Sequence, residues 1–205
     1  MTSSTVTTQA LDGASIDGGL YGDITDFARH THWLNGPVFA YTSYGVALFA
    51  VFMLVGWWAA RRKDASVMAA ALAAPVAMVL AYAVNDAVKS VFTEPRPCRA
   101  LPHDFLIEKC PPLDDYAFPS NHTTVAAAAA VALFFVDRRL GAVATLAALA
   151  MGASRVYVGA HYPHDVLVAF VVGAVVAFAV TWSARRYAAP LVTRLRSGAL
   201  KPLLA

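Results

Sequence analysis

The sequence predicts an all-α fold: a polytopic membrane helix bundle with about five transmembrane helices and an N-terminal amphipathic helix at the membrane surface. Composition is the first reason. Of the 205 residues, 59% are hydrophobic and 14% are charged, whereas an average soluble domain is roughly 45–50% apolar and about 25% charged. The second reason is a pattern in which long apolar runs alternate with short basic clusters. The net charge of +3 is small, and its distribution does not suit nucleic acid.

Five segments have the length and composition of a membrane span, which needs about 20 apolar residues. They are residues 37–60, 65–92, 119–136, 140–158 and 165–184. Pro75 lies inside the second segment and is expected to kink it. The spans belong to one predicted membrane domain, residues 20–186.

Basic clusters at residues 61–63, 138–139 and 185–186 set the predicted orientation. If all five segments cross the membrane, the three clusters fall on one side, which the positive-inside rule assigns to the cytoplasm. The basic tail, residues 187–205, is then cytoplasmic, and the loop at 93–118 faces outside. We expect a multi-pass protein of the plasma membrane with its lipid bilayer as the surrounding partner.

Two further predictions concern the N-terminus and the cysteines. Residues 1–19 are rich in Ser and Thr and are expected to be disordered. Residues 20–34 carry apolar positions at helical spacing and favour a helix on the outer membrane surface, a disordered tail being the alternative. Cys98 and Cys110 share the 93–118 loop, where an extracytoplasmic location favours a disulfide and a cytosolic one would favour free thiols.

Three polar stretches lie at the outer ends of the spans: "KSVFTEPRP" from Lys89, "PSNH" at residues 119–122, and "SRVYVGAHYPHD" at residues 154–165. Ionisable residues at the edge of the hydrocarbon indicate a functional site. Lys89, Arg96 and Arg155 have no matching number of nearby carboxylates, so together they suit a phosphate group. Snorkelling anchors are the alternative for these cations, but that does not explain the histidines.

The histidines and the helix start favour phosphoryl transfer. Ser120 and Asn121 open a helix, and such a terminus binds anions; a plain N-cap is the alternative. The four-residue spacing of His161 and Asp165 lets the carboxylate hold one ring nitrogen and leave the other free as a nucleophile. His122, on a different helix, is placed to act as the acid for the leaving oxygen.

The order K-x6-R-P, P-S-G-H, S-R-x5-H-x3-D resembles the type 2 phosphatidic acid phosphatase superfamily, with Asn121 at the usual glycine position. Asn tolerates a left-handed backbone best among the other residues, so we expect the turn to form. The resemblance assigns phosphate contacts to Lys89, Arg96, Ser120, Asn121, His122 and Arg155. It makes His161 the nucleophile, Asp165 its partner and His122 the acid, with no metal and no other cofactor. His164 falls at a variable position of the third motif and is left outside the site.

Within the superfamily, residues 25–45 and 155–165 look most like the bacitracin-resistance type of undecaprenyl diphosphate phosphatase. This likeness implies removal of the terminal phosphate from a polyprenyl diphosphate at the outer face, which recycles the lipid carrier of peptidoglycan synthesis. Other substrates remain open: phosphatidic acid, phosphatidylglycerophosphate or a polyprenyl monophosphate. A small lipid transporter is the non-enzyme alternative, and it predicts no phosphate release.

Overall fold

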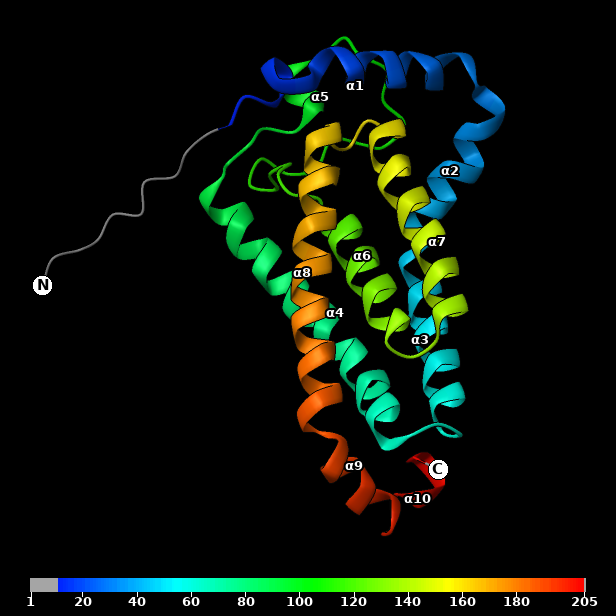
Figure 1. Cartoon of the computed structure of the whole chain (residues 1–205). Helices are drawn as coiled ribbons and strands as arrows, with labels where there is room; N and C mark the ends of the chain where they lie inside the picture. The colour runs from blue at the N-terminus through cyan, green and yellow to red at the C-terminus, as the bar shows by residue number, and fades with distance from the viewer. Residues whose placement is uncertain (1–10, 205) are drawn as a thin grey trace, which may run out of the picture.

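The computed structural model describes residues 11–204, and within this range the chain forms ten helices and no strand (Figure 1). The helices are α1 (Gly13–His30), α2 (His32–Tyr44), α3 (Val46–Ala60), α4 (Ala65–Val91), α5 (Pro97–Ala100), α6 (Asn121–Phe134), α7 (Arg138–Tyr157), α8 (Pro163–Tyr187), α9 (Ala189–Arg196) and α10 (Lys201–Leu204). The predicted all-α bundle is confirmed.

Three of these helices, α4, α7 and α8, are long and apolar enough to cross a membrane. Helices α2 and α3 satisfy the same test only as a pair, and the pair is bent by 56°. Helix α6 has 14 residues, about 21 Å at 1.5 Å per residue, which is shorter than the roughly 30 Å of a hydrocarbon core. The described helices therefore support three spans, or four with the bent pair, rather than the predicted five.

Helix α6 lies at the centre of the bundle, between α4, α7 and α8 (Figure 1). Its middle is a run of buried alanines, residues 126–130, and small side chains let neighbouring helices approach closely. Gly173 of α8 marks the tightest approach, because a Cβ there would lie 2.3 Å from the carbonyl oxygen of Thr124. This packing brings the start of α8 beside the start of α6.

Large apolar side chains remain exposed on the outer faces of α3, α4, α7 and α8. Examples are Leu54, Val55, Val76, Val79, Leu146, Leu149, Leu167, Val171 and Val175. In water a surface of this kind would favour association, whereas in lipid it needs no polar partner. The exposed faces therefore agree with a bundle surrounded by a bilayer.

The three basic clusters lie at the end of the bundle opposite α1 (Figure 1). Lys63 forms an ion pair of 2.9 Å with Asp137, the residue that caps α7. Arg196 of α9 donates to the carbonyl oxygen of Lys63 at 2.8 Å. The C-terminal segment thus folds into two short helices against the basic end.

Helix α1 lies across the other end of the bundle (Figure 1). It begins at Gly13, after the cap residue Asp12, so the segment 13–19 expected to be disordered is helical; residues 1–10 lie outside the described range. Tyr21, Thr25 and Ala28 form its buried face at helical spacing. The helix ends before Thr31, earlier than expected, and Asp17 interrupts it with φ −147° and ψ 27°.

Candidate active site

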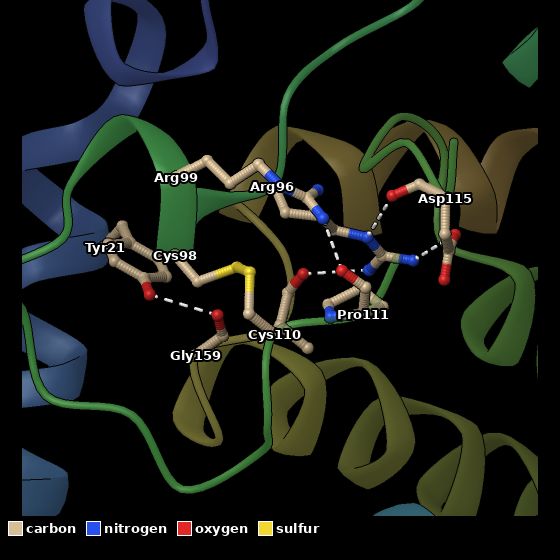
Figure 2. The surroundings of a disulfide bond; sticks show 9 residues. Tyr21, Arg96, Cys98, Arg99, Cys110, Pro111, Asp115 and Gly159 are labelled. Atoms are coloured by element: carbon tan, nitrogen blue, oxygen red, sulfur yellow. Dashed lines mark hydrogen bonds and ion pairs between the residues drawn. A yellow bond between two sulfur atoms is a disulfide. The ribbon is translucent and has the colours of Figure 1, made fainter. Parts of the chain in front are cut away.

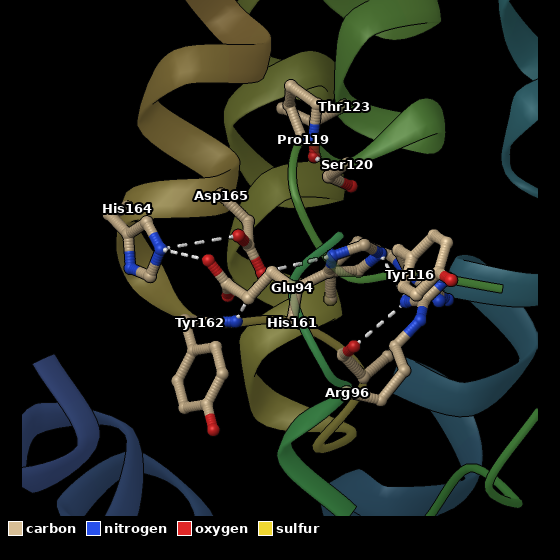
Figure 3. Close-up of polar contacts among 12 residues, drawn as sticks. Glu94, Arg96, Tyr116, Pro119, Ser120, Thr123, His161, Tyr162, His164 and Asp165 are labelled. Carbon is tan, nitrogen blue, oxygen red and sulfur yellow. Dashed lines mark hydrogen bonds and ion pairs between the residues drawn. The ribbon is translucent and has the colours of Figure 1, made fainter. Parts of the chain in front are cut away.

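His161 lies in the short connection between α7 and α8, and its side chain is 1% exposed. Its Nδ1 atom is 3.3 Å from Oδ2 of Asp165 in the first turn of α8, and its Nε2 atom is 2.8 Å from Nη1 of Arg96 (Figure 3). The same Asp165 oxygen accepts from the backbone N–H of Tyr162 at 2.9 Å. The capping geometry of α8 therefore fixes the carboxylate that holds the imidazole.

The partners of His161 define its tautomer. A guanidinium can only donate, so Nε2 accepts from Arg96, and Nδ1 carries the proton and donates to Asp165. Burial, then the positive charges of Arg96 and Arg155, hold the pKa of His161 well below its ordinary 6.5. The ring is neutral and Nε2 is unprotonated, so the lone pair that now accepts from Arg96 is the one that a nitrogen nucleophile requires.

Lys89, Arg96 and Arg155 come from α4, the segment before α5 and α7, and each is at most 6% exposed. The sequence predicts that nearby carboxylates do not match these cations in number, and two carboxylates form ion pairs with the three. Arg96 Nη2 contacts Asp115 at 2.7 Å and Lys89 lies 3.7 Å from the same oxygen. Arg155 binds both oxygens of Glu108, at 2.6 and 3.1 Å. Burial raises and the Arg96 contact lowers the pKa of Asp115, with a net lowering.

The start of α6 carries Ser120, Asn121 and His122. Ser120 is fully buried at the N-cap position, but its side chain caps no backbone N–H; it accepts from Thr123 at 3.1 Å. Asn121 is the first helical residue and, among the described residues, only glycine has a positive φ. The expected use of a left-handed Asn backbone is therefore wrong, because the turn forms with ordinary dihedral angles.

Asn85 of α4 holds this turn in place. Its amide nitrogen donates to the carbonyl oxygen of Pro119 at 3.2 Å and to Oδ1 of Asn121 at 2.6 Å. Its oxygen accepts from Thr124 at 2.7 Å. The sequence places Asn85 one turn from Lys89, but the structure uses it to join α4 to the start of α6.

A cavity of about 130 Å³ opens between these elements. Its lining includes Arg96, Glu108, Asp115, Asn121, His122, Arg155 and His161. Three predicted residues lie behind this lining. Lys89 contacts the lining residue Asp115, Asp165 contacts the lining residue His161, and Ser120 directly precedes Asn121. The structure thus brings all the predicted site residues to one place, with five of them on the cavity wall.

A disulfide between Cys98 and Cys110, Cα atoms 5.9 Å apart, braces the segment between α5 and α6 (Figure 2). Arg99 donates to the carbonyl oxygen of Pro111 within the same loop. Both cysteines also border the cavity. The bridge therefore constrains the loop from which Glu108 and Asp115 form ion pairs with the two arginines.

A group behind Asp165 was not predicted. Glu94, His164 and Asp165 place one donor atom each within 4.8 Å of one another (Figure 3). Such a set could hold a metal ion. The sequence predicts no metal and does not identify this group. Glu94 and His164 are 70 positions apart, so no spacing rule predicts their contact. The only signal in the sequence is that both are polar residues within the motif stretches.

Residues 70–188 match the PAP2 superfamily, and the chain belongs to this family of phosphatases. The apolar bundle and the histidine site together make it a membrane lipid phosphatase. Its fold is similar to the crystal structure of Aquifex aeolicus LpxE, with a TM-score of 0.67 and 22% identity, over 87% of this chain and 100% of that one.

Among named relatives, the undecaprenyl-diphosphatase BcrC of Bacillus subtilis (strain 168) is 30% identical over 159 residues, covering 78% of this chain and 79% of that protein. Phosphatidylglycerophosphatase B of Escherichia coli (strain K12) is 38% identical over 81 residues, 37% of this chain and 32% of that protein. The first likeness extends over most of the chain, and the second over about a third.

Proposed function

We propose that this protein hydrolyses undecaprenyl diphosphate, or a similar polyprenyl diphosphate, to the monophosphate through a phosphohistidine intermediate. One observation carries the proposal: the neutral His161 presents its Nε2 lone pair beside Arg96, in a cavity that Arg155 and His122 also line. The nucleophile, the cations and a second histidine on another helix are the groups that this reaction needs.

In the first step, Nε2 of His161 attacks the terminal phosphorus, and the bond from phosphorus to the bridging oxygen breaks. The Nδ1 proton stays on the ring, and Asp165 stabilises the cationic phosphohistidine. His122 gives a proton to the departing oxygen, so the lipid leaves as a monophosphate. Arg96 and Arg155 donate to the oxygens of the transferred group, where negative charge is greatest.

In the second step, His122 accepts a proton from water as the water oxygen attacks the phosphohistidine. Inorganic phosphate leaves, and His161 returns to its neutral form. Burial and the charge of Arg155 lower the pKa of His122 to about 4, so the ring is neutral before substrate binds. The negative charge of a bound diphosphate favours the charged form of the ring, and His122 gains its proton then.

The phosphate takes the places of Glu108 and Asp115 on the two guanidinium groups. Both carboxylates are partly exposed, with 32% and 43% of the side chain accessible, so water can solvate them once they are displaced. A phosphate presents a similar set of acceptor oxygens to the planar fork of an arginine. Substrate binding is thus an exchange of anions, and the cations are never left unpaired.

The likeness to BcrC over most of the chain supports the diphosphate substrate. The site then lies at the extracytoplasmic face of the plasma membrane, away from the basic end and the C-terminus, and the reaction recycles the carrier of peptidoglycan synthesis. The shorter match to phosphatidylglycerophosphatase B supports a second candidate, a phosphatase for lipid monophosphates.

Phosphate release by purified protein in detergent tests both candidates. The panel contains undecaprenyl diphosphate, undecaprenyl phosphate, phosphatidylglycerophosphate and phosphatidic acid, each assayed with EDTA. We expect the highest kcat/KM for the diphosphate and no release by His161→Ala. A preference for phosphatidylglycerophosphate would support the second candidate, and no release from any lipid would leave the transporter alternative.

A further inference from the structure

His164, the second residue of α8, contacts carboxylates from three parts of the chain, and Figure 3 shows two of them, Glu94 and Asp165. Its Nδ1 atom is 2.8 Å from Oδ1 of Asp17 in α1. Its Nε2 atom is 3.0 Å from Oε2 of Glu94 and 3.5 Å from Oδ1 of Asp165. Both ring nitrogens thus face oxygens of acidic side chains.

This geometry defines the charge of the ring. Ionised carboxylates only accept hydrogen bonds, so a ring that bonds to Asp17 on one side and to Glu94 on the other carries a proton on each nitrogen. His164 is then an imidazolium with one positive charge. Its ring also stacks with the rings of Phe118 and Tyr162, with centroids 5.8 and 5.7 Å away.

The buried acids behind His161 need this charge. Glu94 and Asp165 are both 0% exposed, and two carboxylates without a cation between them cannot both stay ionised in such a place. Oε1 of Glu94 and Oδ1 of Asp165 have no hydrogen-bond partner among the described residues. Apart from the neutral His161, His164 is the only basic side chain within ion-pair distance of Asp165 in the part of the chain described.

Helix α1 contributes the third carboxylate. Asp17, at the interruption of α1, accepts from the ring of His164 and also from its backbone N–H at 2.7 Å. At the start of the same helix, Gly13 lies so near Glu94 that a Cβ would be 2.4 Å from Oε1. Helix α1 therefore closes over the back of the catalytic pair and touches both Glu94 and His164.

We propose that His164, held between Asp17 and Glu94, is a positioning residue that keeps Asp165 ionised and aligned on His161, so that catalysis requires helix α1 in its docked place. This inference rests on the proposed role of His161. None of the three supporting residues lines the cavity, so they act through Asp165 and not on the substrate.

Steady-state kinetics with a double variant test the charge balance. His164→Gln removes the cation and leaves Glu94 facing Asp165; if Asp165 takes the proton in about 90–99% of molecules, kcat falls roughly 10- to 100-fold. KM should stay within about twofold, because the substrate contacts are untouched. Adding Glu94→Gln removes the competing charge, so the double variant should recover most of the lost kcat. A double variant no faster than His164→Gln overturns the proposal, as does a single variant with normal kcat.

The link to α1 has its own variant and control. Asp17→Asn weakens the contact to His164, so kcat should fall at unchanged KM, whereas Asp23→Asn on the exposed side of the same helix should leave both constants unchanged. Equal behaviour of the two variants would show that docking of α1 has no part in catalysis.

A measurement without turnover separates this inference from the proposed function. In protein labelled with 15N-histidine, the His164 signal, assigned by its loss in His164→Gln, should show both ring nitrogens protonated at pH 7.5. A neutral His164 overturns the inference even if the enzyme is active, and an inactive wild type overturns the proposed function alone. Added zinc that binds in one equivalent and shifts this signal would mean a metal site instead.

Discussion

Five carboxylates contact the cations and histidines at and behind the active site, and four of them form two pairs with opposite surroundings. Glu108 and Asp115 belong to the disulfide-braced loop and are 32% and 43% exposed. Glu94 and Asp165 are fully buried behind His161, the proposed nucleophile. Both pairs neutralise positive charge, but only the loop pair touches the cavity.

The difference in exposure decides what each pair can do. A partly solvated carboxylate can leave its arginine at modest cost because water replaces the lost contact, and an exposed ion pair contributes little net stability. A buried carboxylate has no such alternative, and removing its partner leaves an uncompensated charge. We therefore expect substrate to displace the loop pair and to leave the buried pair in place.

The largest expected effect comes from removing the imidazole that joins the two pairs. His161→Ala deletes the nucleophile that we propose for the covalent intermediate, so turnover and phosphoenzyme labelling should both disappear. Rapid quenching with 32P-labelled substrate checks this. Labelling that persists in His161→Ala would assign the nucleophile to another residue.

His122→Ala should slow cleavage of a lipid diphosphate by roughly 10²–10⁴-fold, the usual range for general acid catalysis. It should slow phosphoenzyme formation much less when the leaving group is p-nitrophenolate, which departs without a proton. Rapid-quench rates with both substrates measure the difference. Equal losses for both leaving groups would make His122 a phosphate ligand or a structural residue only.

Arg96→Lys and Arg155→Lys should each lower kcat/KM by at least about tenfold, because a lysine replaces a forked contact with a point charge and loses a bond of roughly 1.5–3 kcal/mol. Initial rates at low substrate concentration measure this. Near-normal rates in both variants would mean that these residues only anchor the bundle in the membrane.

Glu108→Gln tests the exchangeable pair. The neutral amide competes less well with phosphate for Arg155, so KM should fall about two- to fivefold while kcat changes little. Isothermal titration with a non-hydrolysable diphosphate gives the same comparison at equilibrium. A raised KM would show that Glu108 supports substrate binding rather than competing with it.

The smallest expected effect is that of mild acidification on the protonation of His161. The pKa of the buried His161 lies below 6.5, so the ring protonates only as the pH falls through that lowered value. Between pH 8 and pH 6.5 its 15N signals should stay those of a neutral imidazole with the proton on Nδ1. A protonated His161 at pH 6.5 would show that burial does not lower the pKa of this ring.

Much of the site was predictable because its signals are local. The four-residue spacing of His161 and Asp165 predicts contact within one helical turn, and the structure shows that contact across the start of α8. The count of spans was less predictable. Residues 125–136 are apolar throughout, but the polar residues before them belong to the site, and α6 runs only from Asn121 to Phe134.

The sequence by itself determined the helical class, the three motifs and the groups for which we propose the chemistry. These follow from apolar runs and short spacings, which act within a few residues. Only the tertiary structure decided which acid meets which base: Glu108 reaches Arg155 from 47 positions away, and Asp17 reaches His164 from 147. Such pairs leave no periodic trace, because their distance depends on how α1, the braced loop and α8 pack rather than on any local preference of the chain.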